Sequence, residues 1–197
     1  MRILVACEFS GIVREAFAKR GHDAWSCDLL PTEIPGQHIQ GDVIEILDDG
    51  WDLMIAHPPC THLAVAGAVW WKQKQIDGVQ QEAIEFFMKL INSKVNKICV
   101  ENPPGIISSC WRKPDQYIQP YMFGECAQKK LGLWLKNLPQ LVPTKIVDRG
   151  DIYITKSGKS RGGAWTMKLP PSEDRWKIRS RTFRGIADAM AEQWGGL

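Results

Sequence analysis

The feature that most constrains this sequence is an alternation of short apolar runs with longer segments of helical periodicity. The apolar runs are typical of buried strands and lie at residues 2–7, 22–28, 52–56, 97–101 and 131–135. Apolar residues at helical spacing predict helices at residues 11–21, 76–91 and 183–194. Strands that alternate with helices favour βαβ units, so we expect an α/β fold with a mostly parallel sheet.

The chain is long enough for one substantial core and too short for two ordinary domains. It has 197 residues, of which 44% are hydrophobic and 24% charged, as in ordinary globular proteins. Its longest apolar run, residues 63–71, is about half as long as a membrane span requires, and Glu8 interrupts any signal-peptide core. We therefore expect a cytoplasmic protein with no membrane partner. The six cysteines form no CxxC pair, so we expect free thiols.

Positive charge is concentrated near the end of the sequence. Residues 141–184 contain 11 Lys and Arg against 4 Asp and Glu, a net charge of +7, so the remainder of this +3 chain carries −4. A basic segment beside a mildly acidic body favours a polyanionic partner such as nucleic acid. A solvated loop region with spare lysines is the alternative. The Pro, Gly, Ser and Lys content of residues 141–180 also predicts that this region is irregular.

Polar or unusual residues follow four of the predicted strands. The strands lead into Cys-Glu-Phe-Ser-Gly at 7–11, Asp28, His-Pro-Pro-Cys at 57–60 and Glu-Asn-Pro-Pro-Gly at 101–105. The carboxyl ends of parallel strands share one edge of a sheet, and ligands bind in the crevice outside that edge. The four clusters are therefore expected to converge on one site.

The first two clusters have the pattern of a cofactor site. A strand followed by Phe-Ser-Gly and a helix allows backbone N–H groups to approach a ligand closely. Asp28, at the end of the next strand, can accept hydrogen bonds from ribose hydroxyls. The pattern is that of an adenosyl or dinucleotide site, with one glycine in place of three. Alternatively, Gly11 merely starts a helix and Asp28 caps a loop.

The third cluster presents a thiol on a stiff backbone. His57 and Pro58 each precede a proline, which keeps both residues out of the helical region. The side chain of Cys60 is thus directed with little conformational freedom, as suits a nucleophile whose reactive form is the thiolate. Two alternatives are a buried small hydrophobe and a metal ligand, the latter in a cluster with His57, His62 and Cys99. The Pro-Pro backbone would wrap poorly around an ion.

The fourth cluster supplies an acid. Glu101 ends its strand and precedes a second Pro-Pro pair. A half-buried carboxyl at a strand end can keep its proton at neutral pH and donate a hydrogen bond. A surface glutamate that leads into a turn is the alternative.

Together these motifs resemble the DNA cytosine-C5 methyltransferases, most closely the short forms of phages and prophages. Residues 7–11 resemble the family's cofactor loop, Gly-Asp-Val at 41–43 its adenine-contacting segment, and residues 181–194 the terminal segment that closes the cofactor pocket. The Pro-Cys and Glu-Asn pairs resemble its catalytic motifs. The resemblance implies a Rossmann-like methyltransferase fold that uses S-adenosylmethionine as its cofactor. The implied cofactor-binding residues are Phe9, Ser10, Gly11, Ile12, Asp28, Asp42, Val43 and Pro58.

The resemblance also implies a reaction, the methylation of cytosine at carbon 5 in DNA. The Cys60 thiolate would add to carbon 6 of the ring while protonated Glu101 hydrogen-bonds N3, so that carbon 5 becomes nucleophilic and accepts the methyl group. A base then removes the carbon-5 proton and the thiolate leaves. In duplex DNA the cytosine must first leave the stack.

The sequence departs from the family in three places. Ile12, Val13 and Arg14 follow the Phe-Ser-Gly of the cofactor loop, where the family usually has further glycines. The Gln-x-Arg-x-Arg segment that holds the target base is reduced to residues 128–132, where Gln128 is present and Lys129 or Lys130 would replace the first arginine. The target-recognition domain is reduced to residues 141–180, a short basic insertion in a catalytic domain formed by 1–140 and 181–197. Sequence specificity is then low, or comes from an accessory protein or a second subunit.

DNA contacts are expected from the basic segment. The candidates for phosphate contacts are Lys156, Lys159, Arg161, Arg175, Lys177 and Arg179. RNA or a free pyrimidine nucleotide is an alternative acceptor, but a mononucleotide needs no surface of charge +7. A degenerate protein that binds DNA and cofactor without chemistry is the non-enzymatic alternative. No metal is expected.

Overall fold

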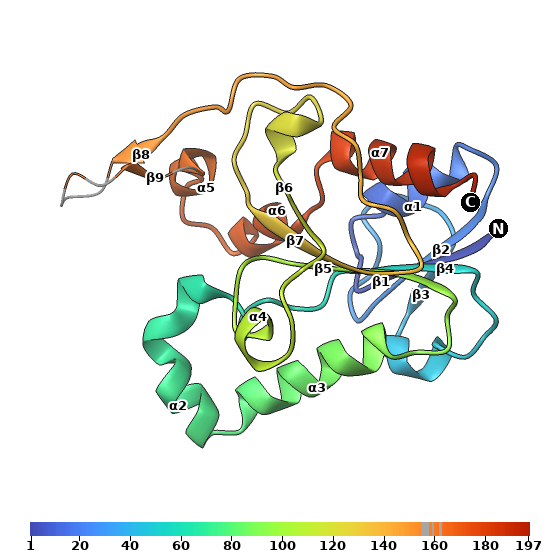
Figure 1. Ribbon diagram of the computed structural model, residues 1–197, viewed down its shortest axis with the longest axis horizontal. Coiled ribbons are helices and arrows are strands. Elements are labelled where there is room, and N and C mark those ends of the chain that lie inside the picture. Colours follow the sequence, from blue (N-terminus) through green and yellow to red (C-terminus); the bar gives the residue numbers. More distant parts are fainter. Residues whose placement is uncertain (155–157, 159, 162) are drawn as a thin grey trace.

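The computed structural model describes residues 1–154, 158, 160–161 and 163–197. Its centre is a seven-stranded sheet in the order β3-β2-β1-β4-β5-β7-β6 (Figure 1). The strands are β1 (Arg2–Ala6), β2 (Asp23–Asp28), β3 (His38–Gln40), β4 (Leu53–Ala56), β5 (Lys97–Asn102), β6 (Gln116–Ile118) and β7 (Leu131–Lys136). The pairs among the first five are parallel, whereas β7 is antiparallel to both β5 and β6. The predicted α/β class with a mostly parallel sheet is confirmed, and the topology is compatible with a Rossmann-like fold.

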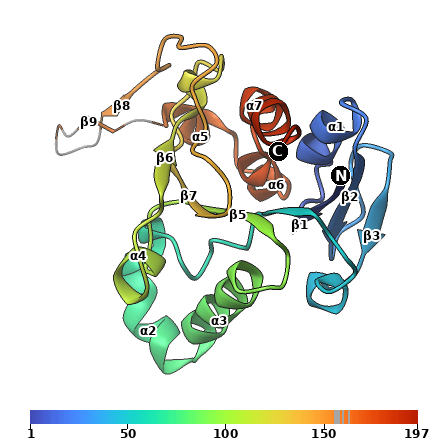
Figure 2. The ribbon, with the colours of Figure 1, turned by 45° about the vertical axis from the view of Figure 1, so that its right-hand side comes forward.

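Helices cover both faces of this sheet. The longer ones are α1 (Ile12–Ala18), α3 (Val79–Ile91) and α7 (Arg184–Trp194). The shorter ones are α2 (Trp71–Ile76), α4 (Ile107–Cys110), α5 (Ala164–Lys168), α6 (Arg175–Ser180) and the 3-10 helices η1 (Val43–Ile46), η2 (Val65–Trp70) and η3 (Pro120–Met122). Helices α1 and α7 lie on one face and α3 on the other, as Figure 2 also shows.

The core follows the two-residue period of the strands. Ile3 and Val5 of β1 belong to the cluster that contains Trp194 of α7. Leu4, between them, belongs to the opposite cluster with Phe87 of α3. Because successive side chains of a strand point to opposite faces, β1 is apolar throughout and buried on both sides. This burial anchors the strand ends that carry the site.

Three elements differ from the sequence-based predictions. The helix expected at 76–91 is two helices, because Gly78 adopts φ of +77° between α2 and α3, a conformation that costs glycine little. Ile76 consequently lies off the buried face and is 71% exposed. The strand at 131–136 is antiparallel to its neighbours. Strands β3 and β6, of three residues each, were not predicted because such short runs show no clear period.

The region expected to be irregular is partly regular. It contains α5, α6 and a small hairpin of β8 (Tyr153–Ile154) with β9 (Ser160–Arg161). Helix α6 packs back on the main body, where Trp176 contacts Phe9 at a centroid distance of 6.0 Å. That this region replaces a recognition domain stays a prediction. Within the described ranges, no helix has the length and apolarity needed to cross a membrane.

Candidate active site at the carboxyl edge of the sheet

The four predicted clusters leave the same edge of the sheet. Parallel pairing sets Ala6 of β1 opposite Cys27 of β2 on one side and Ala56 of β4 on the other, and Ala56 opposite Val100 of β5. Beyond these residues the four strands end side by side. The order of strands reverses between β1 and β4, which is where ligands bind in open α/β sheets.

A pocket of about 410 Å³ opens at this edge, between the ends of β1 and β2 and helix α3. Asp28, Asp42 and Val43, three of the predicted cofactor residues, line it. The other lining residues are mostly apolar and are Cys7, Cys27, Leu29, Gly41, Pro59, His62, Val79, Glu82, Ala83 and Phe86. An apolar pocket of several hundred Å³ with a few polar groups is the usual form of a small-molecule site.

Asp28 is a half-buried acid of this pocket. Its Oδ1 accepts a hydrogen bond from Leu30 N at 3.0 Å. Burial raises the pKa of the Asp28 carboxyl above its ordinary value, with hydrogen bonding opposing the change. Asp42 has a structural task as well, since its Oδ1 accepts from Ile44 N at 3.0 Å and caps η1. Both carboxylates still line the pocket.

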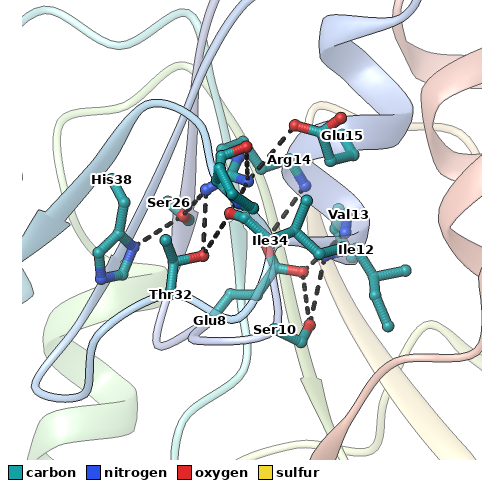
Figure 3. Close-up of polar contacts among 11 residues, drawn as sticks. Glu8, Ser10, Ile12, Val13, Arg14, Glu15, Ser26, Thr32, Ile34 and His38 are labelled. Atoms are coloured by element: carbon teal, nitrogen blue, oxygen red, sulfur yellow. Dashed lines mark hydrogen bonds and ion pairs between the residues drawn. The ribbon is translucent and has the colours of Figure 1, made fainter.

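The loop after β1 is arranged differently from the prediction. Among the described residues, Phe9, Ser10, Gly11, Ile12 and Pro58 do not line the pocket. The buried carboxylate of Glu8 occupies the start of α1, where its Oε1 accepts from Val13 N at 2.7 Å and its Oε2 from Arg14 N at 3.2 Å (Figure 3). The N–H groups of Val13 and Arg14, at the helix start expected to face a ligand, are therefore bound within the protein.

Arg14 continues this buried network. Its side chain is 1% exposed and donates to Ser26 Oγ at 3.1 Å, Thr32 Oγ1 at 3.2 Å and Ile34 O at 2.6 Å. These contacts attach the segment between β2 and β3 to α1 (Figure 3). A Cβ at Gly11 would lie 2.7 Å from the guanidinium, so this glycine makes room for Arg14 as well as adopting φ of +72°.

Cys60 is exposed at the end of the first Pro-Pro segment. Its carbonyl accepts from Leu63 N at 3.0 Å and Ala64 N at 2.8 Å, which fixes a turn directly after the thiol. Desolvation of the sulfur and the charge of Glu101 raise the pKa of the Cys60 thiol, while Lys129 and Arg179 lower it. The net effect places the pKa of the Cys60 thiol above its ordinary value, and the two cations limit this rise.

Glu101 is the main correction to the predicted chemistry. Its Oε2 lies 3.0 Å from His57 Nδ1, and the two side chains are 13% and 11% exposed. Burial raises the pKa of Glu101, but the hydrogen bond from His57 and the charge of Lys129 outweigh burial and place this pKa below its ordinary value. The expectation that Glu101 keeps its own proton at neutral pH is therefore wrong for the ligand-free protein.

The two Pro-Pro segments are tied together. Asn102 Nδ2 donates to Pro58 O at 2.8 Å. Farther along, Val65 N donates to Pro104 O and Ile106 N to Leu63 O, both at 2.9 Å. Gly105 sits so close to the Leu63 carbonyl that no Cβ would fit. We call residues 57–65 and 101–106 with these bonds the elbow frame.

Of the two adjacent lysines 129 and 130, Lys129 is the one that acts on the site. Lys129 Nζ donates to Arg179 O at 2.9 Å, and its charge acts on both Cys60 and Glu101. The Lys130 ammonium lies 4.0 Å from the Tyr117 ring centroid. Gln128 contributes its carbonyl, which accepts from the indole of Trp165 at 3.3 Å. Of the two lysines expected to replace the first arginine, Lys129 is therefore the one whose charge acts on Cys60 and Glu101.

The predicted phosphate contacts divide into three groups. Lys156 and Lys159 lie outside the described residues, and only the backbone of Arg161, in β9, is described. Arg175 donates to Thr166 O at 2.9 Å and Lys177 pairs with Asp174 at 3.0 Å. Arg179 is the member whose charge acts on the Cys60 thiol and lowers its pKa.

Sequence reasoning missed three contributors to the site. His57 was considered only as a metal ligand, and its signal was its place before the Pro-Pro pair. Glu8 and Asn102 were visible within the quoted motifs without an assigned task. In the part of the chain that the structure describes, no three His, Cys, Asp or Glu side chains gather as a metal site would require. Neither a protein-family model nor a curated protein sequence matches this chain.

Proposed function

We propose that this protein methylates cytosine at carbon 5 in DNA with S-adenosylmethionine as methyl donor. The observation that carries the proposal is the convergence of the Cys60 thiol, the Glu101 carboxyl and two cations at one sheet edge, next to a pocket with a half-buried acid. A nucleophile, an acid and a nucleoside-sized pocket are the parts that this reaction needs.

The pocket fits an adenosyl cofactor on its own chemistry. Asp28 offers a carboxylate to the ribose hydroxyls, and the apolar side chains of Val43 and Phe86 offer walls for an adenine ring. When bound, S-adenosylmethionine supplies an electrophilic methyl group. The pocket is bounded by Pro59, the residue before the thiol, so donor and acceptor would meet at Cys60.

The acceptor chemistry follows from the elbow frame. Cys60 adds to carbon 6 as the thiolate, which Lys129 and Arg179 favour. Glu101, once protonated, hydrogen-bonds N3 of the ring and stabilises the charge that develops there. The Asn102 bond to Pro58 holds the two groups in a fixed relation, which removes entropy from the approach.

DNA is favoured as acceptor by the charge of the segment next to the thiol. Helix α6 carries three basic residues of the +7 segment, and it contacts both the cofactor-side loop and Lys129. A polymer backbone would gain from such a surface, whereas a single nucleotide has too few charges to use it. RNA remains the second candidate acceptor because phosphate contacts do not distinguish the two polymers.

The decisive experiment is mass spectrometry of nucleosides from DNA incubated with labelled S-adenosylmethionine and the protein. We expect labelled 5-methylcytosine with the wild type and its loss in Cys60→Ser, because a hydroxyl is a far weaker nucleophile. Cys110→Ser is the matched control, since Cys110 is also exposed but lies at the end of α4. The wild type should also form a covalent adduct with DNA that contains 5-fluorocytosine.

Several outcomes would contradict the proposal. Labelled 5-methylcytosine formed by Cys60→Ser would contradict the covalent mechanism. Labelled product in RNA or in free nucleotides, but not in DNA, would change the acceptor. Cofactor and DNA binding without any labelled product would favour a binding protein that lacks chemistry.

A further inference from the structure

One titratable side chain at the site has no part in the chemistry described above. His57 ends the β4 segment, is 11% exposed and contacts Glu101 Oε2 through Nδ1 at 3.0 Å. A carboxylate can only accept a hydrogen bond, so while Glu101 is ionised the proton of this contact belongs to Nδ1. The contact therefore fixes a proton on the ring nitrogen that faces the acid.

The surroundings of His57 are unusually charged for a buried ring. Glu101 faces it from β5, and the buried carboxylate of Glu8, from the loop after β1, lies near enough for the charge of His57 to act on it. The charge of Lys129 also acts on Glu101, and the charge of Glu101 acts on Cys60. His57 thus contacts the acid of the proposed reaction and interacts electrostatically with a second, buried glutamate.

The second ring nitrogen has no partner. His57 Nε2 is buried and makes no hydrogen bond within the described residues. A histidine that served packing alone would be expected to satisfy both nitrogens, because an unpaired buried polar atom is costly. The single bond of this ring goes to the acid of the proposed reaction.

We propose that His57 and Glu101 act as one proton-sharing acid, in which His57 supplies the proton that Glu101 delivers to N3 of the cytosine. This inference rests on the proposed function. It resolves the difficulty that Glu101 alone is ionised in the ligand-free protein. His57 is a positioning residue in this scheme, since it acts on the substrate only through Glu101.

The proton step balances as follows. In the proposed scheme the reacting form of the site has His57 as imidazolium, Glu101 as carboxylate and Cys60 as thiolate. The sulfur electron pair forms the bond to carbon 6, the C5=C6 π pair moves to the C4–C5 bond, and the C4=N3 π pair moves onto N3. The Nδ1 proton of His57 passes to Glu101, and Glu101 passes a proton on to N3. The products are a neutral imidazole, a carboxylate and a neutral adduct, so the net charge is unchanged.

The kinetic test compares the wild type with His57→Asn over a range of pH. Asparagine keeps an N–H donor for Glu101 but cannot supply a proton. Ionisation of Cys60 is common to both proteins and cancels in the ratio of their single-turnover rate constants. We expect this ratio to rise with pH, by up to about tenfold per unit, because the variant has only a carboxyl as its acid. His22→Asn, at the opposite edge of the sheet, is the control.

A second test does not require methyl transfer. Proton NMR of the wild type should show a strongly downfield imidazole proton shared between Nδ1 and Glu101. It should vanish in Glu101→Gln and His57→Asn and persist in His22→Asn. Absence of this signal in the wild type, or a rate ratio that does not change with pH, would overturn the proposal. A signal without any methyl transfer would refute the proposed function, and the relay with it, and leave a structural hydrogen bond.

Discussion

The loops that follow β1 and β4 leave the sheet side by side, yet they treat their polar groups in opposite ways. Around the first, Glu8 and Arg14 are almost completely buried, and Arg14 Nε is their one buried polar atom without a partner among the described residues. In the second, Cys60 is exposed and His57 keeps one nitrogen without a partner among the described residues. The comparison separates two uses of charge at one edge: a paired network that holds loops in place, and an incompletely paired group that is available for reaction.

In the first loop, the charged side chains are buried and bind other parts of the protein. A buried charge is retained only when hydrogen bonds replace its lost water. Arg14 meets this condition with acceptors from β2 and from the segment before β3. Removing such a group should therefore lower the free energy of unfolding, whereas removing the Cys60 thiol should affect methyl transfer.

The largest effect on stability is expected for Arg14→Ala. The change leaves Ser26, Thr32 and Ile34 without their donor and opens a cavity under Gly11. We expect the free energy of unfolding in urea to fall by about 3–5 kcal/mol. Arg20→Ala, whose side chain is 35% exposed, is the control and should cost less than about 1 kcal/mol. Equal losses in the two variants would mean that the network is not what holds this loop.

A smaller effect, on binding rather than stability, is expected for Asp28→Ala. Loss of the carboxylate should weaken S-adenosylmethionine binding by about 1–3 kcal/mol in calorimetry. Because burial raises the pKa of Asp28, wild-type affinity should fall with decreasing pH already above the ordinary aspartate range. Asp23→Ala, at the other end of β2, should bind normally. An unchanged dissociation constant would place the cofactor outside this pocket.

The smallest effect is expected for Glu33→Gln. Glu33 accepts from Arg181 Nε at 2.8 Å and Nη2 at 2.6 Å, so the pair joins the segment anchored by Arg14 to the end of α6. Both side chains are about one-third exposed, at 32% and 40%, so we expect a loss of at most about 1 kcal/mol that shrinks in high salt. A loss of several kcal/mol would show that the network of Arg14 extends to this surface pair.

Much of the fold could be predicted because its signals are local. The strands at 2–6, 53–56 and 97–102 are continuous apolar runs, which is how strands covered on both faces read. The direction of β7 could not be predicted, since Leu131–Lys136 has the same apolar pattern whether it pairs parallel or antiparallel. The break at Gly78 was visible as a glycine, but the apolar period continued across it.

The site was predictable to the extent that topology alone brings strand ends together. That argument placed Cys60, Glu101 and Asp28 at one edge. Asp42, which lines the same pocket as Asp28, was expected there only from the family resemblance. It could not choose between the adjacent lysines 129 and 130. The direction of each side chain depends on a contact with a segment that is distant in the sequence, Tyr117 for Lys130 and α6 for Lys129. Protonation of Glu101 was equally out of reach, since it depends on His57, 44 residues away.

The elbow frame has a consequence for motion. It is closed at both ends, by the pairing of β4 with β5 before the prolines and by the bonds of Leu63 and Pro104 after them. A closed loop of this kind cannot widen without breaking backbone hydrogen bonds, so the separation of thiol and acid stays constant while substrates come and go. Any movement that admits or releases substrates must then occur in segments outside the frame. The backbone amides of Val65 and Ile106 should exchange their hydrogen with solvent among the slowest at this edge of the protein.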